Sequence, residues 1–204
     1  MYLIGIDEAG RGALAGPVAV GAVCMPADFA WRDVFAAITK RGEPRLRDSK
    51  KLSAAQRETL YEIIAVHGEL RCAHAFSDAA MIDKIGIVPA VHAAAARAID
   101  CLSVSPREAS VLLDAGLRVQ PEWKQEAFVR GDETIPVIAL ASIVAKVLRD
   151  RFMTQIAPLY PAYGLEAHKG YGTFAHRQAI HQEGLSVIHR FSFCRALRTK
   201  QKNV

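Results

Sequence analysis

The chain has 204 residues, which is the length of one domain of about 100–200 residues with room for a small appendage. Hydrophobic residues make up 51% and charged residues 23%, a balance that excludes disordered and low-complexity chains. No stretch approaches the ~18 consecutive apolar residues of a transmembrane helix, and the N-terminus reaches a carboxylate at Asp7 without the basic region of a signal peptide. We therefore expect a cytoplasmic protein that does not bind membranes.

The net charge of +5 is unevenly distributed. From Lys146 onward there are ten lysines and arginines against three acids, whereas residues 1–145 carry 16 basic and 18 acidic residues. A basic C-terminal segment on a slightly acidic body favours a polyanionic partner such as nucleic acid. An ordinary solvated basic surface explains the charge equally well.

Apolar and β-branched runs predict strands at the start of the chain. Residues 2–7 predict a buried strand that ends at two carboxylates, and residues 17–25 predict a second strand after a glycine-rich turn. A short helix is expected over 31–39 and a charged loop over 41–49. Ser53 and Gln56 have capping-box spacing, which predicts a helix from there to about His67.

The second half alternates between strand and helix patterns. We expect strands over 70–76 and 110–114 and around Phe128, and helices over 87–102 and 138–156. After Pro158 the apolar runs shorten and Tyr, Gly, His and Arg become frequent. The economical architecture is an α/β body of residues 1–157, with a mixed sheet flanked by helices, and a small helical C-terminal extension of residues 158–204.

Four acids stand where strands or turns end: Asp7, Glu8, Asp114 and Asp132. Strand ends are common places for active sites in α/β sheets, and carboxylates gathered there repel one another unless a cation neutralises them. Mg²⁺ and Mn²⁺ are the hard divalent ions that prefer oxygen ligands. Two such ions about 3.5–4 Å apart form a site for phosphodiester hydrolysis. The plainer alternative is that each acid is a turn former or a helix cap.

The segment Gly10–Arg11–Gly12 follows the first two acids directly. Glycine has no side chain to block approach, so this segment can bring backbone N–H and C=O groups close to a ligand. An ordinary tight turn between two strands gives the same pattern.

These residues open a series of motifs that resembles the ribonuclease HII family of bacteria. The resemblance extends from about residue 3 to about residue 194. Its motifs are DEAGRG at 7–12 with LAGPV at 14–18, DSKKLS at 48–53, Gly131–Asp132, ASIVAKVLRD at 141–150, HKGYGT at 168–173 with His176, and HRFSF at 189–193.

The resemblance implies a ribonuclease H-like fold and a metal-dependent endoribonuclease with two divalent cations, Mg²⁺ or Mn²⁺. Its implied substrates are the RNA strand of RNA–DNA hybrids and duplex DNA with a single embedded ribonucleotide. The latter is nicked on the 5′ side of the ribonucleotide, which leaves a 3′-hydroxyl and a 5′-phosphate. The family's four metal ligands correspond to Asp7, Glu8, Asp114 and Asp132, and a monomer is expected.

The resemblance also assigns substrate contacts. Gly10, Arg11 and Gly12 are expected to contact the ribose 2′-hydroxyl, the group that distinguishes RNA from DNA. Tyr171 is expected to stack on the deoxyribose after the junction, although an aromatic residue between glycines is often plain packing. Phosphate contacts are expected from Lys50, Lys51, Ser142, Lys146 and Arg149.

Two of these expectations have alternatives or exceptions. Ser142 and Lys146 share a helix face, but an ion pair between Lys146 and Asp150 accounts for the same spacing. Asp150 is interpreted as structural, and no histidine is assigned to the metal. The chain departs from the family pattern at Ala115, which separates Asp114 from its glycine, and at Phe191, where a second basic residue is common.

Two other functions fit the sequence less well. A ribonuclease HIII-type enzyme shares the catalytic domain but normally carries a further N-terminal domain, for which we expect no room before Asp7. A non-catalytic module that binds RNA–DNA hybrids would not need all four acids. Metal-dependent turnover discriminates between the module and the enzyme.

Overall fold

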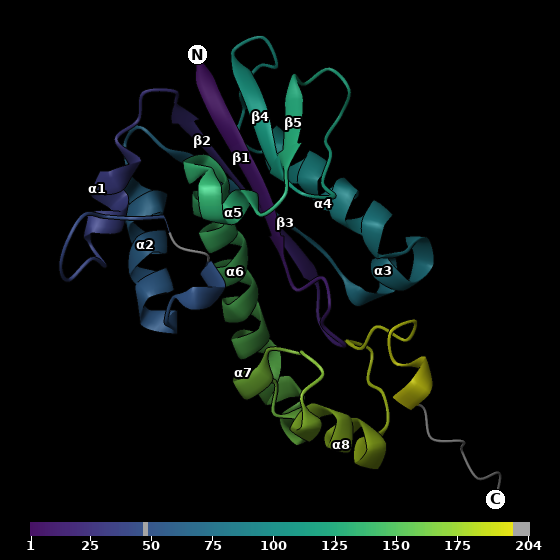
Figure 1. Ribbon diagram of the computed structural model, residues 1–204. Coiled ribbons are helices and arrows are strands. Elements are labelled where there is room, and N and C mark those ends of the chain that lie inside the picture. The colour runs from purple at the N-terminus through teal and green to yellow at the C-terminus, as the bar shows by residue number, and fades with distance from the viewer. Residues whose placement is uncertain (47–48, 198–204) are drawn as a thin grey trace, which may run out of the picture.

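The computed structural model describes residues 1–46 and 49–197 (Figure 1). Asp48 of the 48–53 motif and residues 198–204 of the predicted extension lie outside the described residues. Within the described ranges, no helix is both long and apolar enough to cross a membrane.

A five-stranded mixed sheet forms the centre of the protein, in the order β3-β2-β1-β4-β5. Strands β1, β2 and β3 pair antiparallel, whereas β4 runs parallel to both β1 and β5. The strands are β1 (Tyr2–Ala9), β2 (Val18–Pro26), β3 (Arg71–Ser77), β4 (Ala109–Asp114) and β5 (Gln125–Phe128). The predicted mixed sheet is therefore confirmed, with every expected strand present.

Helices cover both faces of this sheet (Figure 1). They are α1 (Trp31–Ala36), α2 (Ala54–Val66), α3 (Ala79–Ile85), α4 (Ile87–Asp100), α5 (Gly131–Thr134) and α6 (Pro136–Ile156), with a 3₁₀ turn η1 (Ser49–Lys51) before α2. The capping box of α2 is confirmed, because the Ser53 hydroxyl accepts from the Gln56 N–H while the Gln56 side chain accepts from the Ser53 N–H. Helix α3 was not predicted. It begins at Asp78, whose carboxylate accepts from the N–H of Met81.

Alternation along the strands divides the apolar side chains between two cores. Ile4, Ile6 and Val20 are buried on the α4 side, whereas Val23 and Met25 are buried against α2 and α6. On the α6 side the backbones approach closely: a Cβ added at Gly21 would lie 2.4 Å from the carbonyl oxygen of Ala141. This contact fixes where the polar residues of α6, Ser142 and Lys146, lie relative to the ends of β1 and β2.

The C-terminal segment packs on the far end of α6 (Figure 1). Its elements are η2 (Ala157–Leu159), η3 (Pro161–Tyr163), α7 (Leu165–His168), α8 (Phe174–Glu183) and η4 (Arg195–Leu197). A third core joins Ala15 from the turn after β1, Met153 from α6 and Ile180 from α8. Ala15 also forms an isolated β-bridge with His189. The segment is therefore tied to the turn that leaves β1, and a domain boundary at residue 157 stays a prediction.

Candidate active site

The carboxyl ends of β1 and β4 lie side by side and carry the first acids of the candidate site. The parallel register pairs Ile6 with Leu113, so Asp7 and Asp114 follow at neighbouring positions. The expectation that the first strand ends at Asp7 is wrong, because β1 continues to Ala9 and stays paired with β2. The described pairing of β1 with β4 ends at Ile6. Beyond Ile6, β1 stays paired with β2 on one side and borders a cleft on the side of β4.

This cleft has a volume of about 550 Å³. It gathers residues from β1, the turn after it, η1, α2, the end of β4, α6 and the loop before α8. They are Asp7, Glu8, Ala9, Gly10, Arg11, Gly12, Ser49, Lys50, Arg57, Asp114, Ser142, Lys146 and Tyr171. Three residues that the sequence predicted for the site, Lys51, Asp132 and Arg149, are not among those that line the cleft.

Asp132 lies next to Lys50, a residue that lines the cleft. The backbone N–H of Gly131 donates to Oδ1 of Asp114 at 2.9 Å, which fixes the start of α5 against the end of β4. Asp132 is buried, and Nζ of Lys50 lies 3.5 Å from its Oδ2. Asp132 is therefore linked to the cleft through the N–H of Gly131, which donates to Asp114, and through Lys50, which lines the cleft.

The carboxylates of β1 are held in an environment that disfavours their charge. Burial, with the negative charges of Glu8 and Asp114 adding to it, raises the pKa of Asp7 to about 8, although a hydrogen bond from Ser142 opposes the shift. Burial also raises the pKa of Glu8, against the opposing charge of Arg11. Nη1 of Arg11 donates to Oε1 of Glu8 at 3.0 Å. Three acids of the cleft, Asp7, Glu8 and Asp114, thus lie among four cations, and burial is the main reason that the carboxylates of β1 resist ionisation.

A divalent cation fits the chemistry of these donors. Oε2 of Glu8 is buried without a hydrogen-bond partner in the structure, and oxygen ligands are those that Mg²⁺ and Mn²⁺ prefer. Within the described residues, however, no group of three or more His, Cys, Asp or Glu side chains is arranged to hold an ion as it stands.

The position of Arg149 does not agree with its predicted role as a phosphate contact. Its side chain is completely buried and donates to the carbonyl oxygens of Pro17 at 2.9 Å and Ala15 at 3.2 Å. Gly10, at φ +89°, covers it, and a Cβ added there would lie 1.8 Å from Nε of Arg149. The guanidinium therefore stabilises the turn between β1 and β2 from inside the protein, and it does not line the cleft.

The other predicted phosphate contacts lie in different places. Ser142 and Lys146 both line the cleft, as their shared helix face predicts. Lys146 also donates to Oδ1 of Asp150 at 2.8 Å, so the alternative ion pair is present as well. Lys50 is largely exposed at the cleft, whereas Lys51 faces Glu133 at 3.3 Å on the outside of the protein.

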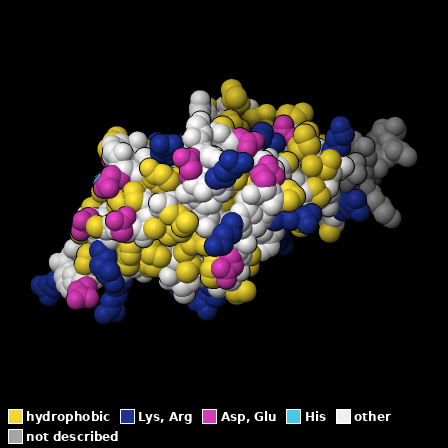
Figure 2. Space-filling view, turned by 90° about the horizontal axis from the view of Figure 1, so that it is seen from above, with side chains coloured by type: hydrophobic (Ala, Val, Ile, Leu, Met, Phe, Trp, Pro, Cys, Tyr) yellow, Lys and Arg dark blue, Asp and Glu magenta, His cyan; other side chains and the backbone are white. Residues whose placement is uncertain are grey.

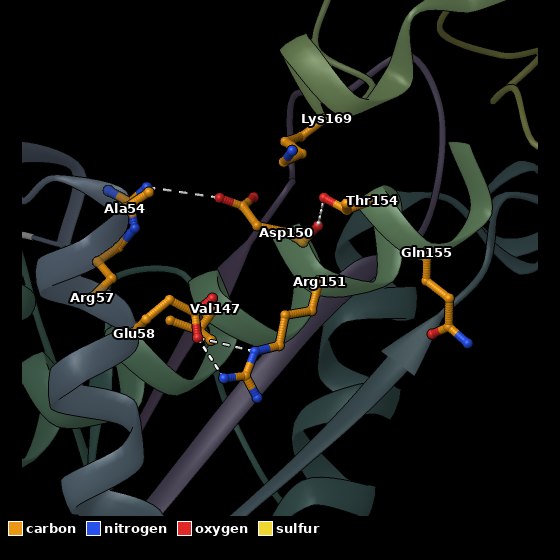
Figure 3. A pocket seen from close by; sticks show the side chains of 9 residues that line it. All are labelled: Ala54, Arg57, Glu58, Val147, Asp150, Arg151, Thr154, Gln155 and Lys169. Carbon is orange, nitrogen blue, oxygen red and sulfur yellow. Dashed lines mark hydrogen bonds and ion pairs between the residues drawn. The ribbon is translucent and has the colours of Figure 1, made fainter. Parts of the chain in front are cut away.

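Sequence reasoning missed Ser49 and Arg57 as cleft residues. The hydroxyls of Ser49 and Ser142 hydrogen-bond at 2.8 Å, and Nη1 of Arg57 donates to the carbonyl oxygens of Ser49 and Leu52. Arg57 also lines a neighbouring groove between α2 and α6 (Figure 3), where it lies 3.8 Å from Asp150. Ser49 belongs to the 48–53 motif, but Arg57 follows a helix cap and carried no signal of its own.

Charge on the surface does not point to a second nucleic-acid face in the view of Figure 2. Lysine and arginine side chains there lie among acidic and apolar ones, so that face carries no field of a single sign. The groove of Figure 3 is also mixed, because Arg57 and Arg151 face Asp150 and Glu58 across it. The cleft remains the best candidate for a polyanion.

Comparison with known proteins agrees with the geometry. A family model described as Ribonuclease HII matches residues 4–196. A protein named Ribonuclease HII from Coxiella burnetii (strain Dugway 5J108-111) is 42% identical over 193 residues, covering 95% of this chain and 88% of the relative.

Two solved structures share the fold at lower identity. The chain is similar to one in the PCNA:RNase HII complex from Archaeoglobus fulgidus, with a TM-score of 0.74, 24% identity and 98% of both chains covered. It is also similar to Bst-RNase HIII in complex with Mn²⁺, with a TM-score of 0.62 and 17% identity over 90% of this chain and 63% of that one. Both likenesses confirm the ribonuclease H-like fold.

Proposed function

The chain belongs to the ribonuclease HII family, and from that premise we propose that it hydrolyses the RNA strand of RNA–DNA hybrids and nicks duplex DNA on the 5′ side of a single embedded ribonucleotide. The products are a 3′-hydroxyl and a 5′-phosphate. As a member of the family it is a ribonuclease H endonuclease, a hydrolase. What we propose beyond that is the junction specificity, the product ends and the residues responsible.

One observation carries the proposal: the Gly10–Gly12 segment and Tyr171 line the same cleft as Asp7, Glu8 and Asp114. A ribose 2′-hydroxyl is the group that separates RNA from DNA, and the glycine segment offers it bare backbone groups. Tyr171 offers an aromatic ring to the next sugar, where an extra hydroxyl would clash. The two features together recognise a ribose followed by a deoxyribose.

Asp7, Glu8, Asp114 and Asp132 would hold two divalent cations, Mg²⁺ or Mn²⁺. When bound, such a pair supplies an activated water and stabilises the leaving 3′-oxygen. The unpartnered Oε2 of Glu8 supports this assignment, since it is a buried oxygen with no hydrogen bond to satisfy it. Burial, which raises the pKa of Asp7, penalises the charge of that carboxylate until a cation offsets it. Mn²⁺ is bound in the Bst-RNase HIII structure of the same fold.

The remaining cleft residues orient the substrate. Lys50 and Lys146 are placed to contact phosphates, and Ser142 lines the cleft and hydrogen-bonds to Asp7. Arg11 holds Glu8 through its guanidinium and keeps the glycine segment next to the acids. No side chain of the protein is needed as a nucleophile. We propose that the enzyme acts in the cytoplasm as a monomer.

The test is a gel assay on a labelled DNA duplex that contains one ribonucleotide, with Mg²⁺, with Mn²⁺ and with EDTA. An all-DNA duplex and a long RNA–DNA hybrid are the matched controls. We expect a metal-dependent nick on the 5′ side of the ribonucleotide, with a 3′ end that a polymerase extends. Cleavage of the long hybrid alone would retain the nuclease and discard the junction specificity.

The second candidate is a non-catalytic module that binds RNA–DNA hybrids. Such a module would bind the same polyanion in the same cleft through Lys50 and Lys146 but would need no metal, so turnover discriminates between the two. Intact hybrid binding without cleavage in either metal would establish the module and overturn the proposed function.

A further inference from the structure

Three histidine rings pack against one another next to the backbone of Tyr171. The rings of His168 and His176 stack with centroids 4.3 Å apart, and those of His176 and His189 are 5.3 Å apart. His176 and His189 are completely buried. The metal site does not use these rings, and neither does the proposed phosphate binding.

Hydrogen bonds to the backbone fix which ring nitrogen carries each proton. Nδ1 of His176 lies 3.0 Å from the carbonyl oxygen of Tyr171, so it donates, because a carbonyl only accepts. Nδ1 of His189 lies 3.0 Å from the backbone N of Ser186 and 2.9 Å from its hydroxyl. Because the backbone N–H can only donate, this Nδ1 accepts, and the proton of His189 is on Nε2. The two Nε2 atoms lie 3.2 Å apart, and His189 therefore donates to His176.

The chain of donors thus runs in one direction, from Ser186 through His189 and His176 to the carbonyl of Tyr171. Every ring nitrogen in it has a partner only when both rings are neutral. An added proton on His176 would set two N–H groups against each other at the Nε2 contact. His168 obeys the same rule, since its Nδ1 accepts from Gly170 and its Nε2 donates to Tyr163.

The backbone on both sides of Tyr171 is held from different elements. The carbonyl oxygen of Tyr171 accepts from Thr173 at 2.8 Å as well as from His176. The carbonyl oxygen of Gly170 accepts from the N–H groups of Leu14 and Ala15, in the turn after β1. His176 is therefore the side chain that ties Tyr171 to helix α8, while Gly170 ties the same loop to the turn that carries Gly10–Gly12.

We propose that His176 and His189, both neutral, are positioning residues that set where Tyr171 lies in the cleft. His176 acts through the N–H that it donates to the carbonyl of Tyr171, and His189 acts by holding the ring of His176. The inference rests on the proposed function, in which Tyr171 distinguishes the sugar after the ribonucleotide. It assigns junction specificity to a buried cluster that touches neither substrate nor metal.

The surroundings of the cluster keep it neutral. The titratable groups that face His176 are Tyr163 from η3, His168 from α7 and His189 from the loop after α8. Among the described residues no carboxylate pairs with any of the three rings. Burial accordingly lowers the pKa of His176 to about 4, and it lowers that of His189 as well.

The test compares three variants by the ratio of kcat/KM on a single-ribonucleotide duplex to kcat/KM on a long hybrid. In His176→Asn an amide stays near the Nδ1 position and can still donate to Tyr171, whereas His176→Leu has no donor. His181→Asn is the control, because His181 lies exposed on the same helix. We expect the ratio to fall roughly three- to tenfold in His176→Leu, the effect of one lost hydrogen bond, and to stay within about twofold in the other two.

A second measurement uses the wild-type protein and does not depend on activity. The ¹⁵N NMR shifts of the imidazoles should show the proton on Nδ1 of His176 and on Nε2 of His189 at pH 7. Below about pH 5 the ring signals of Tyr171 should move together with the protonation of His176. The opposite tautomers at pH 7, or Tyr171 signals that ignore this titration, would overturn the proposal.

The two measurements separate the two levels of the argument. If the wild-type protein cleaves neither substrate, the proposed function fails, and the Tyr171 signals of His176→Leu still judge the positioning. Signals shifted in His176→Leu and unshifted in His181→Asn support it. Signals unshifted in both variants, or a ratio in His176→Leu equal to that of the wild type, overturn it.

Discussion

Arg149 and Arg190 grip the same turn from opposite sides: Arg190 donates to the carbonyl oxygen of Gly16, and Arg149 donates to the carbonyl oxygens of Ala15 and Pro17 on either side of it. Both guanidiniums are completely buried, and burial lowers the pKa of each. Arg190 also donates to the carbonyl oxygen of Arg11 at 2.9 Å. Two buried positive charges therefore bind four backbone carbonyls, those of Arg11, Ala15, Gly16 and Pro17. These four hydrogen bonds hold the backbone of the turn after β1 in place.

Arg149→Gln should consequently lower stability more than it lowers substrate affinity. Losing charge-assisted hydrogen bonds to buried carbonyls should reduce the free energy of unfolding by about 2–4 kcal/mol, measured by denaturant titration. Arg195→Gln, on an exposed arginine, is the control and should leave stability within about 0.5 kcal/mol. Unchanged stability in Arg149→Gln together with weaker hybrid binding would restore Arg149 as a phosphate contact.

Asp7→Asn should abolish cleavage while it stabilises the metal-free protein. The raised pKa of Asp7 means that its charged form destabilises the fold, so removing the charge should raise the free energy of unfolding at pH 8–9 by about 1 kcal/mol or more. Thermal unfolding in EDTA measures this, with Asp33→Asn in exposed α1 as the control. Added Mg²⁺ should stabilise the wild type and not the variant. A variant that cleaves at the wild-type rate would contradict the assignment of Asp7.

Tyr171→Ala should chiefly affect cleavage at an isolated ribonucleotide. The ring centroid lies 5.1 Å from the guanidinium carbon of the buried Arg149 and 5.6 Å from Nζ of Lys146, so contacts with both cations stabilise its position at the cleft. Because stacking needs the ring and not the hydroxyl, Tyr171→Phe should retain most of the activity that Tyr171→Ala loses. The measurement is kcat/KM on both substrates. Equal losses on the long hybrid and on the single ribonucleotide would contradict the junction role.

The sequence patterns predicted where the strands lie but not their order in the sheet, and for β5, with the sequence QEAF, they indicated only a position around Phe128. The strand-end positions of Asp7 and Asp114 indicated a shared site, and the parallel pairing of β1 with β4 places the two ends at the same edge of the sheet. These patterns could not predict the contact of Ser49 with Ser142, which joins positions 93 residues apart through tertiary packing. The resemblance assigned Arg149 to the phosphate contacts, but it does not show that Gly10 covers this side chain in the fold.

Lys146→Gln distinguishes phosphate binding from the ion pair with Asp150, both of which the structure accommodates. If Lys146 contacts a phosphate, the slope of log Kd against log salt should fall by about 0.9, the value for one phosphate contact. Fluorescence anisotropy with a labelled hybrid in EDTA at several KCl concentrations measures the slope. Asp150→Asn is the matched control, because it removes the ion pair and leaves the lysine. An unchanged slope in Lys146→Gln would leave only the ion pair.

Stability should also fall in mild acid on account of the buried histidines. The pKa of His176 is about 4 in the folded protein, mainly because of burial, against 6.5 for an ordinary histidine. Between these values the unfolded chain binds more protons than the folded one, so the free energy of unfolding decreases as pH falls from 6.5 to 4. His176→Asn removes this contribution, and its unfolding free energy should lose about 1–3 kcal/mol less than that of the wild type over the same range. His181→Asn should follow the wild type in denaturant titrations at pH 7 and pH 4.5. If the unfolding free energy of His176→Asn falls with pH as steeply as that of the wild type, His176 is charged in the folded protein. That outcome would contradict the neutral ring inferred from its hydrogen bonds.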